Sequence, residues 1–170
     1  MPEPSEWLAS IGELLDELGI DWAAIGALAA NRYRATVRFT SDADALVEWV
    51  ERLDDALRAR GYDVQVIADE GEPPHLLRLR RQEEQVDLLP PVVEYQQVAL
   101  DRAVDRVITA EDVIVFKLIA WRARDRDDIR SILETGRRLD RDYIVRWAEA
   151  WEVTDRWAEA QTWGAMADGD

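Results

Sequence analysis

Two stretches of the chain decide the fold, and they are Arg38-Phe-Thr-Ser-Asp42-Ala-Asp44-Ala-Leu-Val47 and Val86-Asp87-Leu88-Leu89. Residues two apart on a strand share one face, so Asp42 and Asp44 would project their side chains together, about 6.6 Å apart. A neighbouring strand lies only about 4.8 Å away, which allows Asp87 to join them. Three converging carboxylates supply the hard oxygen ligands that a pair of Mg²⁺ ions needs for displacement at phosphorus. The pattern favours a two-metal phosphoryl-transfer site.

A structural alternative exists for the same residues, because acidic residues are abundant in this chain. The Asp-x-Asp spacing recurs at Asp125/Asp127, Asp140/Asp142 and Asp168/Asp170. In the alternative, Asp42 or Asp44 caps a helix that starts near Glu48, and Asp87 merely ends a strand. Against it, Asp42 and Asp44 lead directly into an apolar run, where a carboxylate needs a partner.

The composition limits the classes of function. The chain has 170 residues and a formal net charge of −15, which argues against general affinity for DNA or an anionic membrane. It contains no cysteine and a single histidine, His75, so a thiolate or multi-histidine metal site is excluded and oxygen-bound Mg²⁺ or Mn²⁺ remains. No apolar run approaches the roughly 20 residues of a membrane span, and the N-terminus lacks a signal-like pattern. We expect a cytoplasmic protein.

The hydrophobic periodicity predicts an α+β fold with a mixed sheet flanked by helices. The expected elements are a helix over 5–18, a strand over 21–25, a glycine turn into a helix ending near Asn31, a strand over 38–47, a helix over 48–60, and strands over 62–67, 76–80 and 86–89. From Glu94 onward the chain looks mostly helical. We expect a core over 1–92, a helical part packed on it over 93–164, and a frayed tail over 165–170.

In this order, the elements resemble the DNA polymerase β-like nucleotidyltransferase superfamily. The run Ala110-Glu-Asp-Val-Ile-Val-Phe-Lys117-Leu-Ile-Ala-Trp-Arg122-Ala-Arg124-Asp125-Arg-Asp-Asp128-Ile129 is similar to small bacterial members grouped with abortive-infection toxin (AbiEii-like) nucleotidyltransferases. The resemblance spans about residues 21–133. It implies a two-metal transferase whose substrate is an NTP.

The resemblance also implies roles for individual residues. Asp42, Asp44 and Asp87 would be the catalytic carboxylates and would hold two Mg²⁺ ions. The nucleotide would contact Gly26 and Ala27 under its phosphates, together with the basic residues Arg38, Lys117, Arg122 and Arg124.

Structural readings compete with several of these roles. Lys117, the one lysine among 21 basic residues, would either reach the nucleotide or extend its ammonium to the surface. Asp125 would cap the next helix with Asp128 reaching back, as in a capping box. His75 is expected to have no chemical role. The eight tryptophans are expected to pack helices rather than stack on bases.

The function hypothesis is transfer of NMP from an NTP to a hydroxyl acceptor with release of pyrophosphate. The acceptor is open: tRNA, a protein or a small molecule, and the toxin-like resemblance also implies a cognate antitoxin. Local positive charge for RNA would come from two arginine groups: Arg78, Arg80 and Arg81, and Arg122, Arg124, Arg126 and Arg130. Two rivals are a non-catalytic binding or antitoxin-like module of the same fold, and a metal-dependent phosphohydrolase.

Overall fold

The computed structural model describes residues 3–165 and confirms a mixed α+β fold. The chain divides into two compact units. The sheet unit contains the chain up to Leu28 and Phe39–Ile108, and the helical unit contains Ala29–Arg38 and the chain from Thr109. Residues 93–108 therefore group with the sheet, and the short segment 29–38 groups with the later helices.

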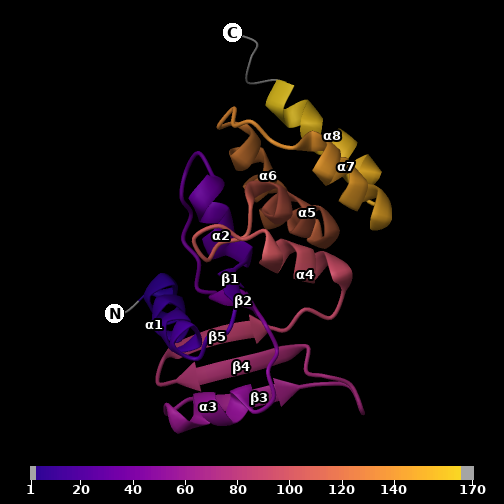
Figure 1. Cartoon of the computed structure of the whole chain (residues 1–170). Helices are drawn as coiled ribbons and strands as arrows, with labels where there is room; N and C mark the ends of the chain where they lie inside the picture. The colour runs from indigo at the N-terminus through magenta and orange to yellow at the C-terminus, as the bar shows by residue number, and fades with distance from the viewer. Residues whose placement is uncertain (1–2, 166–170) are drawn as a thin grey trace. The chain divides into compact units, whose positions relative to one another are not determined.

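The sheet unit is built on one five-stranded sheet, in the order β1-β2-β5-β4-β3 (Figure 1). The strands are β1 (Trp22–Ala24), β2 (Asp44–Val47), β3 (Asp63–Ile67), β4 (Leu76–Arg81) and β5 (Glu84–Leu89). All neighbouring pairs are antiparallel except β2 and β5, which run parallel. Val107 forms a further isolated bridge with Ala24, beside β1. The unit also contains α1 (Pro4–Glu17), α3 (Leu53–Ala59) and α4 (Glu94–Asp101).

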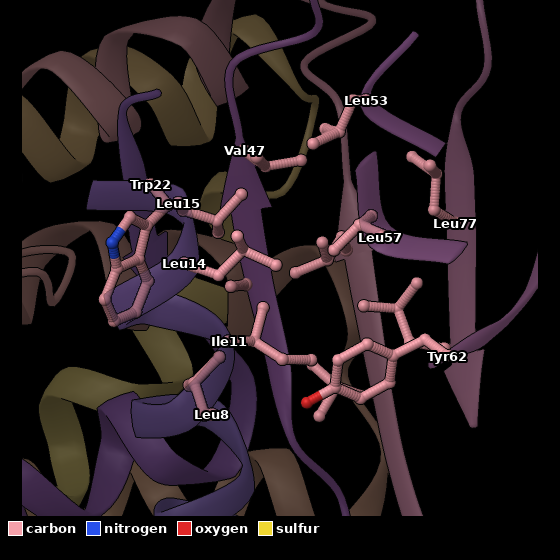
Figure 2. Close-up of a cluster of buried hydrophobic side chains, with 14 of the residues drawn as sticks. Leu8, Ile11, Leu14, Leu15, Trp22, Val47, Leu53, Leu57, Tyr62 and Leu77 are labelled. Carbon is pink, nitrogen blue, oxygen red and sulfur yellow. The ribbon is translucent and has the colours of Figure 1, made fainter. Parts of the chain in front are cut away.

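One face of the sheet is closed by a hydrophobic cluster beneath α1 and α3 (Figure 2). Leu8, Ile11 and Leu15 of α1 follow the three-to-four-residue period of an amphipathic helix and are buried. Leu53 and Leu57 do the same for α3. Residues at alternate positions in the strands, and Ala43 just before β2, complete the cluster, among them Ala45, Val47, Leu77, Leu79, Val86 and Leu88. The residues between them must therefore point to the opposite face.

Gly12 shows how closely α1 packs on the sheet. A β-carbon at this position would lie 2.1 Å from the ring of Trp22, a distance that no real contact allows. The Trp22 indole N–H also donates a 3.0 Å hydrogen bond to the Asp16 carboxylate of the same helix. Glycine at position 12 is therefore required by the approach of the helix to β1, and any larger residue would push the two apart.

The helical unit contains α5 (Ala110–Ala120), α6 (Ala123–Leu133), α7 (Arg141–Ala150) and α8 (Thr154–Ala165). The helix α2 (Gly26–Tyr33) begins in the sheet unit and ends in this one. The core of the helical unit is formed by fully buried aliphatic side chains, including Ile114, Leu118, Ile129, Ile132 and Ile144. Within residues 3–165, no helix is both long and apolar enough to cross a membrane.

The predicted elements agree with the structure except in two segments. The strand expected over 38–47 is confined to Asp44–Val47. Upstream, the Asn31 side chain binds both the N–H and the C=O of Arg38, at 3.1 and 2.8 Å, and so takes the place of a ladder partner. Asp42 consequently precedes the strand, and its N–H donates to the Thr40 hydroxyl at 3.1 Å.

The helix expected over 48–60 is also shorter, because α3 covers only Leu53–Ala59. Glu48 directly follows β2 and is not helical, and its N–H donates to the Asp21 carbonyl at 2.8 Å, just before β1. Arg52, just before the helix, has a left-handed backbone with φ of 66°. The proposal that Asp42 or Asp44 caps a helix near Glu48 is therefore wrong. The predicted tail residues 166–170 lie outside the described part of the chain.

Candidate functional site

Asp44 and Asp87 are direct neighbours on the parallel strands β2 and β5. The Asp87 N–H donates a 2.9 Å hydrogen bond to the Ala43 carbonyl, which fixes this register. Ala43 and Ala45 are buried on the core face, so Asp44 projects from the other face, where both carboxylates are partly exposed. Asp42 is exposed just before the strand. The structure thus makes Asp44 and Asp87 direct neighbours, with Asp42 two residues before Asp44 and outside the strand.

Gly26 closes this site from the side of β1. Its backbone is left-handed, with φ of 62°, and a β-carbon on it would lie 2.9 Å from Oδ2 of Asp44. The preceding N–H, of Ile25, donates to the Asp44 carbonyl at 3.0 Å. The predicted glycine turn, with the buried Ala27 after it, therefore opens α2 directly beside the Asp44 carboxylate. Only glycine meets both the backbone angle and the close approach.

Arg78 is the direct neighbour of Asp87 on its other side, on β4. Its guanidinium forms a two-pronged ion pair, with Nε 2.9 Å from Oδ1 and Nη2 2.7 Å from Oδ2 of Asp87. These hydrogen bonds from Arg78 to Asp87 raise the pKa of the guanidinium above its usual value. The sequence placed Arg78 only in a general basic patch. The signal that could have found it is strand alternation, which puts Arg78 on the face opposite the buried Leu77 and Leu79.

The donor set has the right chemistry for Mg²⁺, because it offers carboxylate oxygens on neighbouring backbone positions. However, among residues 3–165 no group of three or more His, Cys, Asp or Glu side chains is arranged to hold a metal ion. Both oxygens of Asp87 face Arg78 instead. A three-carboxylate metal centre thus requires Asp87 to turn away from Arg78. Binding of Mg²⁺ or Mn²⁺ by Asp42, Asp44 and Asp87 stays a prediction.

The four basic residues predicted to bind nucleotide, Arg38, Lys117, Arg122 and Arg124, all belong to the helical unit. Lys117 is buried, with its side chain 7% exposed. Its ammonium lies 3.0 Å from Oδ1 of Asp125 and 2.9 Å from Oδ2 of Asp128. The buried ammonium does not extend to the surface, and contact of Lys117 with a nucleotide stays a prediction. The single lysine of the chain is part of an internal ion-pair network.

Asp128 is the centre of that network and is completely buried. It accepts hydrogen bonds from Arg38 at 2.8 and 2.9 Å and from Arg34, in addition to Lys117. Burial alone would raise the pKa of Asp128, but the hydrogen bonds and charges of Arg38 and Lys117 outweigh it and lower the pKa to about 2. The carboxylate is therefore ionised at neutral pH in spite of its burial. Arg34, which also pairs with Asp127, was not predicted from the sequence.

Asp125 joins Lys117 to the start of α6. Its carboxylate accepts from the backbone N–H of Arg122 at 3.0 Å and from the Arg122 side chain at 2.7 Å. Burial raises the pKa of Asp125, but the hydrogen bonds from Arg122 and Lys117 lower it by more than burial raises it, so the net shift is downward. The prediction that Asp125 precedes and caps this helix, with Asp128 reaching back, is wrong. The helix starts at Ala123, Arg122 is the N-cap, and Asp125 is the residue that reaches back.

The other predicted basic residues are found in separate settings. Arg80 donates to the Gln85 side chain at 3.2 Å, and Arg81 pairs with Glu84 at 3.1 Å and lies over the Tyr62 ring. In the helical unit, Arg126 and Arg130 lie over the rings of Trp121 and Trp163, while Arg124 is exposed. His75 lines a cavity with Asp69, Glu72 and Gln96.

Comparison with known proteins supports the fold. No family model and no curated protein matches the sequence. Among solved structures, the antibiotic-resistance factor ANT(2'')-Ia is similar over 92% of this chain and 94% of its own, with a TM-score of 0.55 and 17% identity. An antigenic nucleotidyltransferase-like protein from Paracoccidioides brasiliensis is similar over 77% of this chain and 74% of its own, with a TM-score of 0.48 and 20% identity. The likeness to ANT(2'')-Ia shows that the chain has a nucleotidyltransferase-type fold.

Proposed function

We propose that the protein is a Mg²⁺-dependent nucleotidyltransferase that transfers NMP from an NTP to a hydroxyl acceptor and releases pyrophosphate. The observation that carries this proposal is the register of Asp44 and Asp87 on parallel strands beside the Gly26 turn. The resemblance to abortive-infection toxin nucleotidyltransferases, seen in the sequence, suggests the same chemistry.

Each residue of the site would have a definite task. Asp42, Asp44 and Asp87 would hold the metal, and Asp87 would also receive or orient the acceptor hydroxyl proton. Bound Mg²⁺ would neutralise triphosphate charge and align the attacking and leaving oxygens. The backbone at Gly26 and Ala27 opens a helix, whose N-terminus favours a phosphate. The main contribution of the chain would be positioning and charge complementarity, because such reactions involve little covalent work by the protein.

The test is transfer of label from each α-³²P-NTP, with Mg²⁺, to a bacterial lysate separated into RNA, protein and small molecules. Asp44→Asn should abolish labelling. Asp63→Asn is the matched control, since Asp63 is an exposed acid on β3 of the same sheet and should leave labelling unchanged. Activity of Asp44→Asn within a few-fold of the unmodified protein would contradict the proposal. Release of free nucleotide and phosphate, rather than an adduct, would indicate a phosphohydrolase.

A second candidate is a nucleotide-binding module of the same fold without turnover, such as an antitoxin-like partner. The Arg78–Asp87 ion pair favours it, because both oxygens of the third carboxylate are bound by a guanidinium of the chain itself. Nucleotide binding without any labelled product would support this candidate.

The acceptor follows from the labelled fraction. Given the net charge of −15, an RNA acceptor such as tRNA needs locally concentrated positive charge. Binding of tRNA should then weaken steeply with salt, and a flat salt response would point to a protein or small-molecule acceptor. A cognate antitoxin would be identified by suppression of labelling.

A further inference from the structure

Three side chains form a row across the face of the sheet that is opposite the core. Asp44, Asp87 and Arg78 are consecutive register partners on β2, β5 and β4. Asp87 therefore has an acid on one side and a base on the other, each at the distance of one strand. It can turn toward either neighbour.

In this structure Asp87 turns toward Arg78. Both carboxylate oxygens are bound by the guanidinium, at 2.9 and 2.7 Å, in the fork geometry that is specific to arginine. The pair is accessible, with side chains 31% and 16% exposed. An ion pair at such a position can be exchanged for other partners from solution, unlike the buried pairs of Lys117.

We propose that Arg78 withholds Asp87 from the metal until a triphosphate arrives, so that the divalent cation and the nucleotide bind cooperatively. This inference rests on the proposed function. A metal that binds alone must separate the pair and leave Arg78 without an anion. A triphosphate bound with the metal gives Arg78 a new anionic partner, while the metal takes Asp87. Each ligand therefore strengthens the binding of the other, and the coupling is reciprocal.

Arg80 provides a matched control for Arg78. It lies two residues along β4, on the same face, and its side chain donates to the neutral Gln85 rather than to an acid. Arg80→Gln and Arg78→Gln each remove one positive charge from this strand. Only Arg78→Gln releases a predicted metal ligand.

The experiment measures Mn²⁺ binding to the full chain by electron paramagnetic resonance, without nucleotide and with the α,β-methylene analogues of the NTPs. Without nucleotide, Arg78→Gln should bind Mn²⁺ about tenfold more tightly than the unmodified protein, the factor for about one broken ion pair. Arg80→Gln should stay within about twofold. The coupling is the factor by which the analogue increases the affinity for Mn²⁺. Chelation of Mn²⁺ by the analogue contributes equally to this factor in all variants. The factor should therefore be smaller in Arg78→Gln than in Arg80→Gln, because Arg78→Gln has lost the ion pair that the triphosphate would replace.

Equal or weaker Mn²⁺ binding by Arg78→Gln would overturn the inference; weaker binding would mean that Arg78 orients Asp87 as a ligand instead. Arg78→Lys keeps the charge but loses the fork, and it should give an intermediate affinity if Arg78→Gln fails to fold. Failure of the proposed function is seen separately, as Mn²⁺ binding that Asp44→Asn does not change.

Discussion

Replacement of Lys117 by methionine is expected to destabilise the protein strongly. The ammonium lies within 3.0 Å of Asp125 and 2.9 Å of Asp128, and both carboxylates are fully buried. Removing one partner of a buried ion pair leaves an uncompensated charge and costs about 3–5 kcal/mol. Because Arg38 and Arg122 still contact these acids, we expect the lower end of this range.

The change in the free energy of unfolding is measured by urea denaturation, with circular dichroism at 222 nm. A loss of about 3 kcal/mol should lower the melting temperature by on the order of 10 °C for a chain of this size. Asp125→Asn in the Lys117→Met background should cost less than the sum of the two single changes, since it removes the stranded charge. The control is Arg60→Met, which breaks an exposed pair with Glu17 and should cost at most about 1 kcal/mol.

This experiment decides between two roles for Lys117. An exposed ion pair contributes at most about 1 kcal/mol. If the free energy of unfolding of Lys117→Met differs from that of the unmodified protein by less than this, the stabilising role of Lys117 is refuted. A simultaneous large loss of nucleotide affinity would then support the direct nucleotide contact predicted from the sequence. Strong destabilisation would instead make any loss of activity an indirect effect of the damaged helical unit.

Three further predictions follow from single contacts. Gly26→Ala should reduce kcat/KM at least about tenfold in the labelling assay, because the new methyl group would meet Oδ2 of Asp44 at 2.9 Å and the backbone φ is 62°; unchanged kcat/KM would refute the close contact. Tyr143→Phe should cost about 1–3 kcal/mol in urea denaturation, since the Tyr143 hydroxyl donates at 2.5 Å to the buried Asp112. The pKa of Asp128 is lowered from 3.8 to about 2, so the folded state binds fewer protons than the unfolded state near pH 3. Its contribution of roughly 2 kcal/mol should be complete above about pH 5 and lost as the pH falls through about 2, a dependence that Asp128→Asn should lack in urea titrations at each pH.

The sequence predicts the sheet well where periodicity and packing agree. Alternating apolar residues predict β3, β4 and β5, and the amphipathic pattern predicts α1. The strand prediction is wrong over 38–43. There the side chain of Asn31, seven residues before Arg38, hydrogen-bonds the N–H and C=O of Arg38, which the predicted strand would have used for pairing. A side-chain contact of this kind leaves no periodic signal.

For the site, spacing and embedding in apolar residues make Asp44 and Asp87 candidates, the family resemblance adds to this, and the structure places the two residues in register. The partners of these acids are not predictable in the same way, because Arg78 and Asp87 meet only through strand pairing across the β4–β5 hairpin. The single lysine of the chain draws attention to Lys117 but does not predict its buried ion pairs. Its partners Asp125 and Asp128 follow eight and eleven residues later, on a separate helix whose packing the sequence does not specify.

The acids of this chain divide into two classes by what a substitution should damage. Asp128 is fully buried and already bound by several cations, so no divalent ion can replace them without removing more positive charge than it adds. Asp44 and Asp87 are partly exposed register partners, and Asp87 is bound by Arg78 at the surface of the sheet, so a divalent cation brings more positive charge to this pair than the arginine it displaces. Neutralising the sheet acids should therefore abolish metal binding with little loss of stability. Neutralising Asp128 should do the opposite, and a variant of either class that showed the other behaviour would contradict this assignment.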